Sequence, residues 1–417
     1  MNAASPPAVG PRILGLLALA YILNFVDRNV IGVLAVPIRA EFGLSDTALS
    51  VLGVAFGIFY AVIAVPIARL ADRGRRVDVV SGAIAVWSIF TAVCGLAQGY
   101  AQLVAARIGV AFGEAGAIAP SHALISDYFP HERRSRALAL FSLGIPIGSA
   151  LGIFFGGWLA SALSWRSAFI ILGIVGLPLA LVVRLYIPEP QRGALDEQPS
   201  STPVPLRAVT AALSKIPSFW LMSVGAALGS IPGYGLIFWL PSLFNRSFGL
   251  PVDQVGFFYG SVMLVGGVAG TWLGGWLGDR LGPARPAAYA IIPAVSLLSS
   301  VPLYAAGIFA SSLPIAWVLL SAAQMMSLLW LGPVFAAVQQ LVLPSMRATA
   351  SATFLLVNNL IGIAGGIYVL GWLSEAMKTA YGTDSLRYSV LFSLAFYLLS
   401  GAVYLLASIR LPQDMRR

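Results

Sequence analysis

Four ionisable residues lie inside long apolar segments, where their side chains could handle protons. They are Asp27, Arg28, Arg107 and Glu114. Charges inside a bilayer cost a few kcal/mol and usually mark an ion or proton pathway. Arg107 and Glu114 are seven residues apart, so in a helix they share a face and lie roughly 10 Å apart along its axis. We expect Asp27 to bridge that gap and to pair with Arg107 rather than with Arg28, because adjacent helical residues point about 100° apart.

A carboxylate held between a desolvating environment and a guanidinium can bind and release a proton. Burial favours its neutral form, a nearby guanidinium favours its ionised form, and arginine itself stays protonated. We therefore predict a proton-coupling site made of Asp27, Glu114 and Arg107, with Arg28 and His122 in secondary positions. The alternative is a fixed ion pair between two helices, since two acids and two arginines balance in charge. His122 could relay protons near neutral pH, but we favour a hydrogen-bonded packing role.

The composition predicts the elements that must hold these charges in place. Of 417 residues, 59% are hydrophobic and 10% are charged, and the mean hydropathy is +0.87, whereas soluble domains carry about 25% charged residues. Such a chain is typical of a polytopic membrane protein, and its segments must be helices because lipid cannot satisfy an open backbone. We predict an all-α protein with twelve transmembrane helices. They span residues 12–36, 48–70, 78–98, 101–127, 135–161, 166–187, 217–244, 254–278, 286–309, 313–342, 348–374 and 387–409.

Basic residues set the expected orientation. If both termini are cytoplasmic, most Lys and Arg residues fall in cytoplasmic loops, as the positive-inside rule requires. We expect a multi-pass protein of the inner (plasma) membrane. The net charge of +9 then reflects contact with anionic membrane lipids and not with nucleic acid.

An internal repeat divides the chain into two similar halves. "FGLS" at Phe42 returns as "FGLP" at Phe248, and "ADRGRR" at Ala71 returns as "GDRLGPAR" at Gly278. Offsets this constant predict two six-helix bundles related by a parallel repeat, as in major facilitator transporters. The expected domains are 1–187 and 217–417, joined by a cytoplasmic linker at 188–216. Apolar residues at helical spacing near the end of this linker predict a short helix on the inner membrane surface, or else a disordered connection.

Two glycine ladders and two charged loops stand out within the halves. Gly144–Gly156 and Gly266–Gly278 each repeat glycine every four residues, which either packs neighbouring helices closely or lines a seam between the halves. The charged loops predict a cytoplasmic gate, because an acid beside a helix end can pair with a basic residue or a helix N-terminus. Positive-inside anchoring is the simpler reading of the same residues. The predicted gate residues are Asp72, Arg73, Arg76, Arg133, Asp279, Arg280 and Arg347.

Several stretches together resemble the spinster-like branch of the major facilitator superfamily. They include "YILNFVDRNVIGVLAVPI", "LADRGRR" and "RIGVAFGEAGAIAPSHALISDYFPHERRSRALAL", all in the first half. The resemblance implies a proton-coupled or proton-regulated transporter, in which Asp27, Arg107 and Glu114 serve coupling and gating. Animal members export lysolipids and sphingosine phosphate, so the resemblance implies a lipid-like cargo.

Uncharged polar and aromatic residues of the second half could contact such a substrate. Together with Arg107 they are Tyr234, Trp239, Gln324, Trp330, Asn358, Asn359 and Tyr368. This set suits an amphipathic or anionic organic molecule, drug-like or lipid-like, better than a free sugar. The aromatic members could equally form interfacial belts.

The leading hypothesis is a monomeric secondary transporter that works by alternating access, with export by proton antiport favoured. Symport or uncoupled facilitation of an organic anion stays open, as does a sensor or a lipid scramblase. An enzyme is disfavoured because the chain has two histidines, one cysteine and no HExxH or GxSxG motif. A nucleotide-driven pump would need a GxxxxGK[ST] loop. No metal or organic cofactor is expected.

Overall fold

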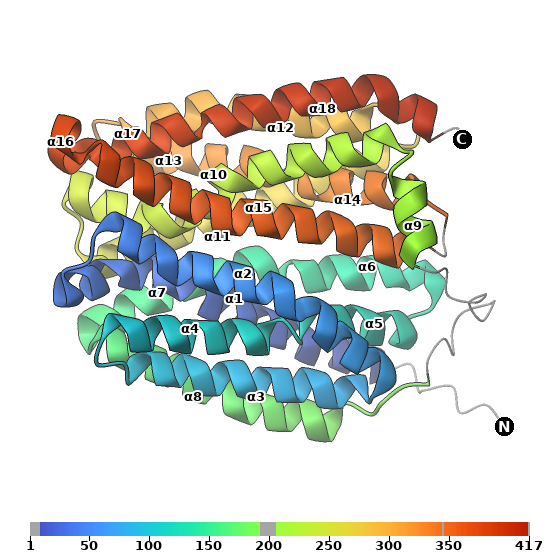
Figure 1. The fold of residues 1–417 in the computed structure, drawn as a ribbon, viewed down its shortest axis with the longest axis horizontal. Coiled ribbons are helices and arrows are strands. Elements are labelled where there is room, and N and C mark those ends of the chain that lie inside the picture. The colour runs from blue at the N-terminus through green and yellow to red at the C-terminus, as the bar shows by residue number, and fades with distance from the viewer. Residues whose placement is uncertain (1–8, 192–205, 344–345, 416–417) are drawn as a thin grey trace. The chain divides into compact units, whose positions relative to one another are not determined.

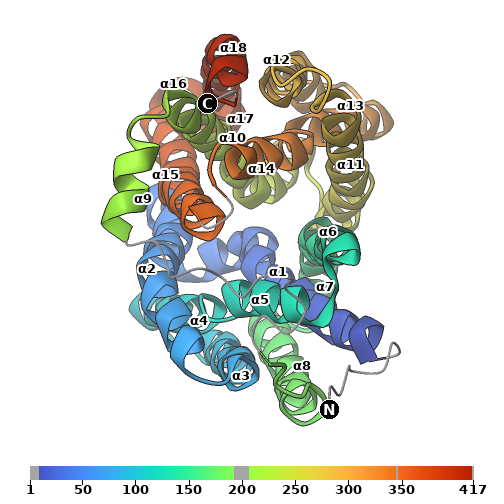
Figure 2. The ribbon, with the colours of Figure 1, turned by 90° about the vertical axis from the view of Figure 1, so that its right-hand side faces the viewer.

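The computed structural model describes residues 9–191, 206–343 and 346–415, and within them the chain is helical with no strand. Twelve helical stretches of these residues are long and apolar enough to cross a membrane. The prediction of an all-α protein with twelve spans is therefore confirmed. Figure 1 shows the long helices of each half running side by side, and Figure 2 views the same helices from their ends.

Two of the six spans in the first half are interrupted. A turn at 115–117 separates α4 from α5 within one span, and a turn at residue 143 separates α6 from α7 within another. The helices of this half are α1 (Val9–Phe42), α2 (Asp46–Arg73), α3 (Arg76–Gly95), α4 (Tyr100–Glu114), α5 (Ile118–Tyr128), α6 (His131–Ser142), α7 (Gly144–Ala162) and α8 (Trp165–Tyr186).

The second half follows a short helix and repeats the pattern with its own interruptions. A turn at 329–330 separates α13 from α14, and the last span is divided among α16, α17 and α18. The helices are α9 (Leu206–Leu213), α10 (Pro217–Phe248), α11 (Val252–Leu281), α12 (Ala288–Ile308), α13 (Leu313–Leu328), α14 (Leu331–Gln340), α15 (Arg347–Ala376), α16 (Lys378–Tyr381), the 3₁₀ turn η2 (Gly382–Asp384), α17 (Ser385–Ser393) and α18 (Ala395–Asp414).

The repeated "FGL" motif ends a helix in both halves. Gly43 follows α1 with a φ of 62°, and Gly249 follows α10 with a φ of 68°. Only glycine adopts this left-handed conformation without a steric penalty, so it commonly terminates helices. The repeat thus marks the turn that leads into α2 and, one copy later, into α11.

The chain forms two compact units. The beginning of α2 belongs to the unit of the second half, and the beginning of α11 belongs to the unit of the first half. One unit comprises Met1–Leu44, Ala55–Ser200 and Pro251–Gly260, and the other comprises Ser45–Val54, Ser201–Leu250 and Ser261–Arg417. The start of α2 therefore packs with the second half, and the start of α11 packs with the first. In the first unit Gly157 of α7 lies directly against Gly256 of α11, where a Cβ on Gly157 would come within 2.9 Å of the Gly256 Cα.

Both glycine ladders pack helices within a single unit. A Cβ at Gly152 would lie 2.9 Å from the Val26 Cα of α1, and one at Gly270 would lie 3.0 Å from the Met325 Cα of α13. The idea that the ladders line a seam between the halves is therefore wrong. Small residues here let two backbones approach in a setting where close packing drives helix association. The hydrogen bond from Asn29 Nδ2 to Ser149 Oγ, 2.9 Å long, also joins α1 to α7.

The short helix expected after the linker is present as α9. Its Val209 and Leu213 are buried, and α9 packs against α15. Trp220 of α10 donates to the carbonyl of Leu213 at 3.1 Å, which fixes the end of α9. Residues 206–213 are thus helical, while the position of this helix on the inner membrane surface stays a prediction, and residues 192–205 of the linker lie outside the described part of the chain.

Candidate functional site

The four intramembrane charges gather in the first unit, on α1 and α4. Asp27 and Glu114 have no exposed surface, and Arg107 is 1% exposed. Glu114 is the last residue of α4, directly before the interruption at 115–117. An interrupted helix leaves backbone groups free for other partners and is common at membrane transport sites.

Glu114 is paired with Arg28. The guanidinium donates to Glu114 Oε2 from Nε at 3.1 Å and from Nη2 at 2.9 Å. Both side chains are almost fully buried, with exposures of 9% and 0%. Charge-assisted bonds of this kind in a low-dielectric site are strong, and they are lost if the carboxylate becomes protonated.

Arg107 does not pair with the Asp27 carboxylate. Its Nη1 donates instead to the backbone carbonyl of Asp27 at 3.3 Å. The expected pairing is therefore wrong in this structure. Arg28, placed in a secondary role by the sequence argument, forms the ion pair, because its long side chain reaches Glu114 while Asp27 points toward α3. Adjacent helical residues point about 100° apart, and Asp27 and Arg28 do face different neighbours, as this angle predicts.

Aromatic rings lie against both guanidiniums. The Arg28 guanidinium carbon lies 4.6 Å from the Tyr60 ring centroid, 4.9 Å from that of Phe25 and 5.3 Å from that of Phe56. The Arg107 guanidinium carbon lies 4.9 Å from the same Phe56 ring. Such contacts stabilise a desolvated cation. Sequence reasoning missed these partners, although "FGIFY" on α2 presents its aromatic residues at helical spacing.

The interruption beside Glu114 has a counterpart in the second half. Pro120 is the third residue of α5, and Pro333 is the third residue of α14, after interruptions at 115–117 and 329–330. Paired interruptions at corresponding positions of two repeats are the best sequence pointer to a transport site. The glycine and proline residues of "EAGAIAP" and "LWLGP" carry this signal in the sequence.

Most of the predicted substrate residues lie in the second unit with hydrogen-bond partners of their own. Trp239 is fully buried and donates to the carbonyl of Ile367 at 2.9 Å. Gln324 is buried and accepts from the Tyr304 hydroxyl at 2.8 Å. Both side chains therefore serve helix packing here. Trp330 lies in the interruption between α13 and α14, where it is 8% exposed.

The remaining predicted substrate residues lie on α10 and α15. Asn358 accepts from Ser230 at 2.7 Å and is buried, and Asn359 accepts from the Tyr234 hydroxyl at 3.2 Å. Tyr234 and Asn359 are partly exposed, and Tyr368 is 41% exposed. These four keep their predicted role as a hypothesis. His122 packs its ring edge-to-face on Phe141, with centroids 5.2 Å apart.

The loop between α2 and α3 contributes one strongly bound residue. Arg76 donates from Nε to Glu189 at 2.9 Å and is also paired with Asp127, so it ties the start of α3 to the ends of α5 and α8. Burial alone would raise the pKa of Glu189, but hydrogen bonds from the Val77 N–H and from Arg76 outweigh burial and hold that pKa below its usual value. Sequence reasoning did not anticipate these two acidic partners.

The other predicted gate residues are exposed wherever the structure describes them. The side chain of Asp72 lies outside the described part of the chain. Arg347 donates to the carbonyl of Gln339 at 3.0 Å, and the Arg280 guanidinium lies 5.2 Å from the Trp276 ring. The exposed members are Arg73, Arg133, Asp279, Arg280 and Arg347.

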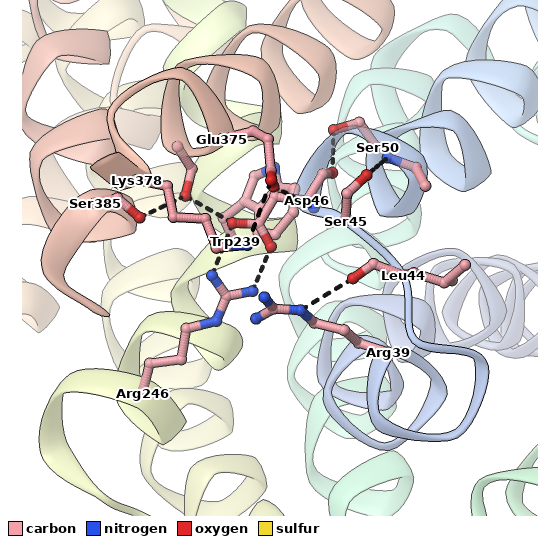
Figure 3. A network of polar contacts seen from close by, with 12 residues as sticks. Arg39, Leu44, Ser45, Asp46, Ser50, Trp239, Arg246, Glu375, Lys378 and Ser385 are labelled. Atoms are coloured by element: carbon pink, nitrogen blue, oxygen red, sulfur yellow. Dashed lines mark hydrogen bonds and ion pairs between the residues drawn. The ribbon is translucent and has the colours of Figure 1, made fainter. Parts of the chain in front are cut away.

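A second buried ion pair lies at the first turn of α2 (Figure 3). Arg246 donates two hydrogen bonds of 2.6 and 2.8 Å to the Asp46 carboxylate, and the Ser374 hydroxyl donates a third to the same carboxylate at 2.7 Å. Glu375 in turn accepts from the backbone N–H of Asp46 at 3.1 Å. Close approach is possible because Gly371 of α15 faces the Asp46 carbonyl, 2.8 Å from where a Cβ would stand. All these residues belong to the second unit. Nothing in the types or spacing of these residues predicts the network.

No group of three or more His, Cys, Asp or Glu side chains among the described residues is arranged to hold a metal ion. Twelve apolar spans in two repeated sets of six, with a cluster of four buried charges inside the first set, are the architecture of a secondary transporter of the membrane.

Comparison with known proteins gives the family. The chain matches the Major Facilitator Superfamily over residues 17–366. It is 36% identical over 414 residues to an MFS-type efflux pump of Mycolicibacterium smegmatis, covering 97% of this chain and 95% of that one. It is 27% identical to human protein spinster homolog 1, covering 99% and 83%.

Solved structures agree. A bacterial homologue of the human lysosomal transporter Spinster, crystallised in an inward-facing and unoccupied conformation, matches with a TM-score of 0.88 and 31% identity, covering 98% of this chain and 99% of that one. A D-xylose–proton symporter matches with a TM-score of 0.70 at 18% identity, which shows the shared fold alone. The chain belongs to the major facilitator superfamily and, within it, to the spinster-like branch.

Proposed function

We propose that this protein is a proton-coupled transporter that exports a small amphipathic or anionic organic molecule by antiport. It would act as a monomer in the plasma membrane, with both termini in the cytoplasm. The observation that carries the proposal is the complete burial of two carboxylates, Asp27 and Glu114, in one cluster with two arginines. Buried membrane carboxylates are expensive, and they usually serve ion or proton movement.

The geometry supports a simple coupling step. A proton taken up by Glu114 removes the negative partner of Arg28, because a neutral carboxyl no longer compensates the guanidinium at 2.9 Å. Arg28 then keeps its contacts with the aromatic rings and with the Asn24 amide oxygen, but it no longer faces the negative charge of Glu114. An anionic head group would supply the missing charge, so the ionised Glu114 carboxylate and the head group compete for the same guanidinium, and this linkage would couple an anion to the proton by symport. A cationic amphiphile would instead compete with the proton for Glu114 itself, which is the exclusion that antiport requires. Arg107, held on a backbone carbonyl and not on a carboxylate, offers a second cation to an anionic head group.

The cargo class rests on uncharged polar residues of α10 and α15 and on the relatives. Tyr234, Asn358, Asn359 and Tyr368 supply a few polar groups among apolar helices, which suits an amphipathic molecule. Two relatives are named as an efflux pump and as a homologue of a lysosomal transporter, and both names fit export of an organic molecule.

Proteoliposomes loaded with a pH-sensitive dye test the proposal. A short-chain lysophospholipid and an amphipathic dye are the first substrates, applied to native protein and to Glu114→Gln. Glu41→Gln is a matched control, because Glu41 is an exposed acid that pairs with Arg166 at the end of α1. We expect substrate-dependent proton movement in the native and control proteins and its loss in Glu114→Gln.

Substrate flux without proton movement, unchanged in Glu114→Gln, would reduce the cluster to a structural bridge and the protein to a facilitator. Proton and substrate moving in the same direction would establish symport. Equal lipid movement in both directions without a gradient would establish a scramblase.

A further inference from the structure

The Asp27 carboxyl faces two hydrogen-bond donors on α3. Trp87 and Thr91 are the side chains of that helix whose N–H and O–H are directed at it. They are four residues apart, so they lie on one face of α3. Both carboxylate oxygens, the Trp87 indole nitrogen and the Thr91 hydroxyl are buried and have no hydrogen-bond partner among the described residues.

This combination is unusual for a packing contact. Buried polar groups in native proteins nearly always find a partner, and the exceptions tend to be bridged by ordered water or to serve a function. Here one acceptor group on α1 and two donor groups on α3 lie near one another with matching chemistry. An ionised carboxylate would gain most from these donors, since bonds to a charged group are the stronger kind.

The other charged and titratable groups near Asp27 are few. Glu114 and Arg107 face it from α4, and Cys94 lies near it on α3. Helix α7, which packs along α1, contains no charged or titratable residue. On α8 the two arginines lie near the helix ends, where Arg166 is bound to Glu41 and Arg184 to Asp78.

We propose that Trp87 and Thr91 are positioning residues for the proton on Asp27. Directly or through a bridging water, they donate to the ionised carboxylate and lose that bond when the proton arrives. They thereby set the pH at which Asp27 exchanges its proton. The inference rests on the proposed proton coupling, but it concerns the titration of one carboxyl and can be measured apart from transport.

The same helix offers a matched control. The Ser88 hydroxyl is also buried and without a partner among the described residues. It points away from Asp27, however, into the space left by Gly176 of α8, whose added Cβ would collide with it. Ser88→Ala therefore removes the same kind of group from α3 without touching the carboxyl.

Infrared difference spectroscopy of the full-length protein in lipid tests the inference. The carboxyl band of Asp27 is identified by its absence in Asp27→Asn and is titrated against pH. In Thr91→Val and in Trp87→Phe, we expect the midpoint to move to higher pH by about one unit, because removing a donor weakens the ionised form. Thr91→Ser should restore the native midpoint, and Ser88→Ala should leave it unchanged.

Each other outcome overturns the inference. An unchanged midpoint in Thr91→Val, an equal shift in Ser88→Ala, or an Asp27 band that does not titrate between about pH 4 and pH 10 would do so. Thr91→Val alone decides the matter if Trp87→Phe fails to fold. Proton movement that persists in proteoliposomes of Asp27→Asn would instead count against a role for Asp27 in coupling, and it leaves the spectroscopic result to be read independently.

Discussion

Arg246→Gln should destabilise the second unit strongly, because it leaves a buried carboxylate without its cation. The Asp46 side chain is 2% exposed and the Arg246 side chain 16%. Removing one partner of a buried pair costs about 3–5 kcal/mol. Partial access of water through the site of Arg246 lowers the expected loss to about 2–4 kcal/mol. Asp46→Asn should cost less, since a neutral amide still accepts the Ser374 bond.

Thermal unfolding in detergent, followed by the fluorescence of the ten tryptophans, measures this loss. At about 2 °C per kcal/mol for a chain of this size, Arg246→Gln should melt about 4–8 °C below the native protein. The double variant with Asp46→Asn should melt higher than the sum of the two single losses predicts, because the stranded charge has been removed. Arg166→Gln is the control, since its pair with Glu41 is 33% and 42% exposed and should matter by less than about 1 kcal/mol.

Two results would refute this reasoning. A melting temperature of Arg246→Gln equal to that of Arg166→Gln would mean that Asp46 does not depend on its partner. Strictly additive losses in the double variant would mean that the two residues act separately and that the network in Figure 3 is not a unit.

Three further predictions concern the first unit. The hydrogen bonds that keep the pKa of Glu189 below its usual 4.5 stabilise the fold above that pH, and the contribution is lost as the pH falls through the lower folded value. Glu189→Gln should thus melt below the native protein at about pH 7, and the two should converge as the pH falls through the lower folded pKa. Gly152→Val should abolish folded expression, because its side chain would collide with the α1 backbone, whereas Gly15→Ala, with open space around it, should express normally. Phe56→Ala should lower stability by about 2–3 kcal/mol through lost packing and contact with two guanidiniums, while Phe59→Ala, at a 42% exposed position, should cost less than about 1 kcal/mol in the same melting assay.

The twelve spans could be predicted from the sequence because they depend on composition over about 20 residues, and lipid leaves helices as the only solution. The repeat could also be read, since "FGLS" and "FGLP" encode the same left-handed glycine turn at Gly43 and Gly249. Both properties are local or periodic, so no tertiary information was needed.

The details of the site depend on side-chain direction, which the sequence does not give. Helical geometry placed Asp27 and Arg28 on different faces but could not say which face meets α4, and the pairing with Arg107 was therefore wrong. The prediction that the glycine ladders line a seam between the halves was wrong for the same reason. A ladder indicates that another helix comes close, but it does not say which helix. Trp239 and Gln324 were selected for chemistry alone, and their hydrogen bonds to Ile367 and Tyr304 became visible only in three dimensions.

The Asp46 network has a consequence for how the chain is made. Asp46 precedes Arg246 by 200 residues, Ser374 by 328 and the Glu375 carboxylate by 329. At a synthesis rate of about 5–20 residues per second, the acid waits about 10–40 s before its cation leaves the ribosome. The first six spans are consequently made before the first turn of α2 has its partners. The hydrogen bonds of Asp46 can all form only after the seventh and eleventh spans have been made, because Arg246 lies on the seventh span and Ser374 and Glu375 lie on the eleventh.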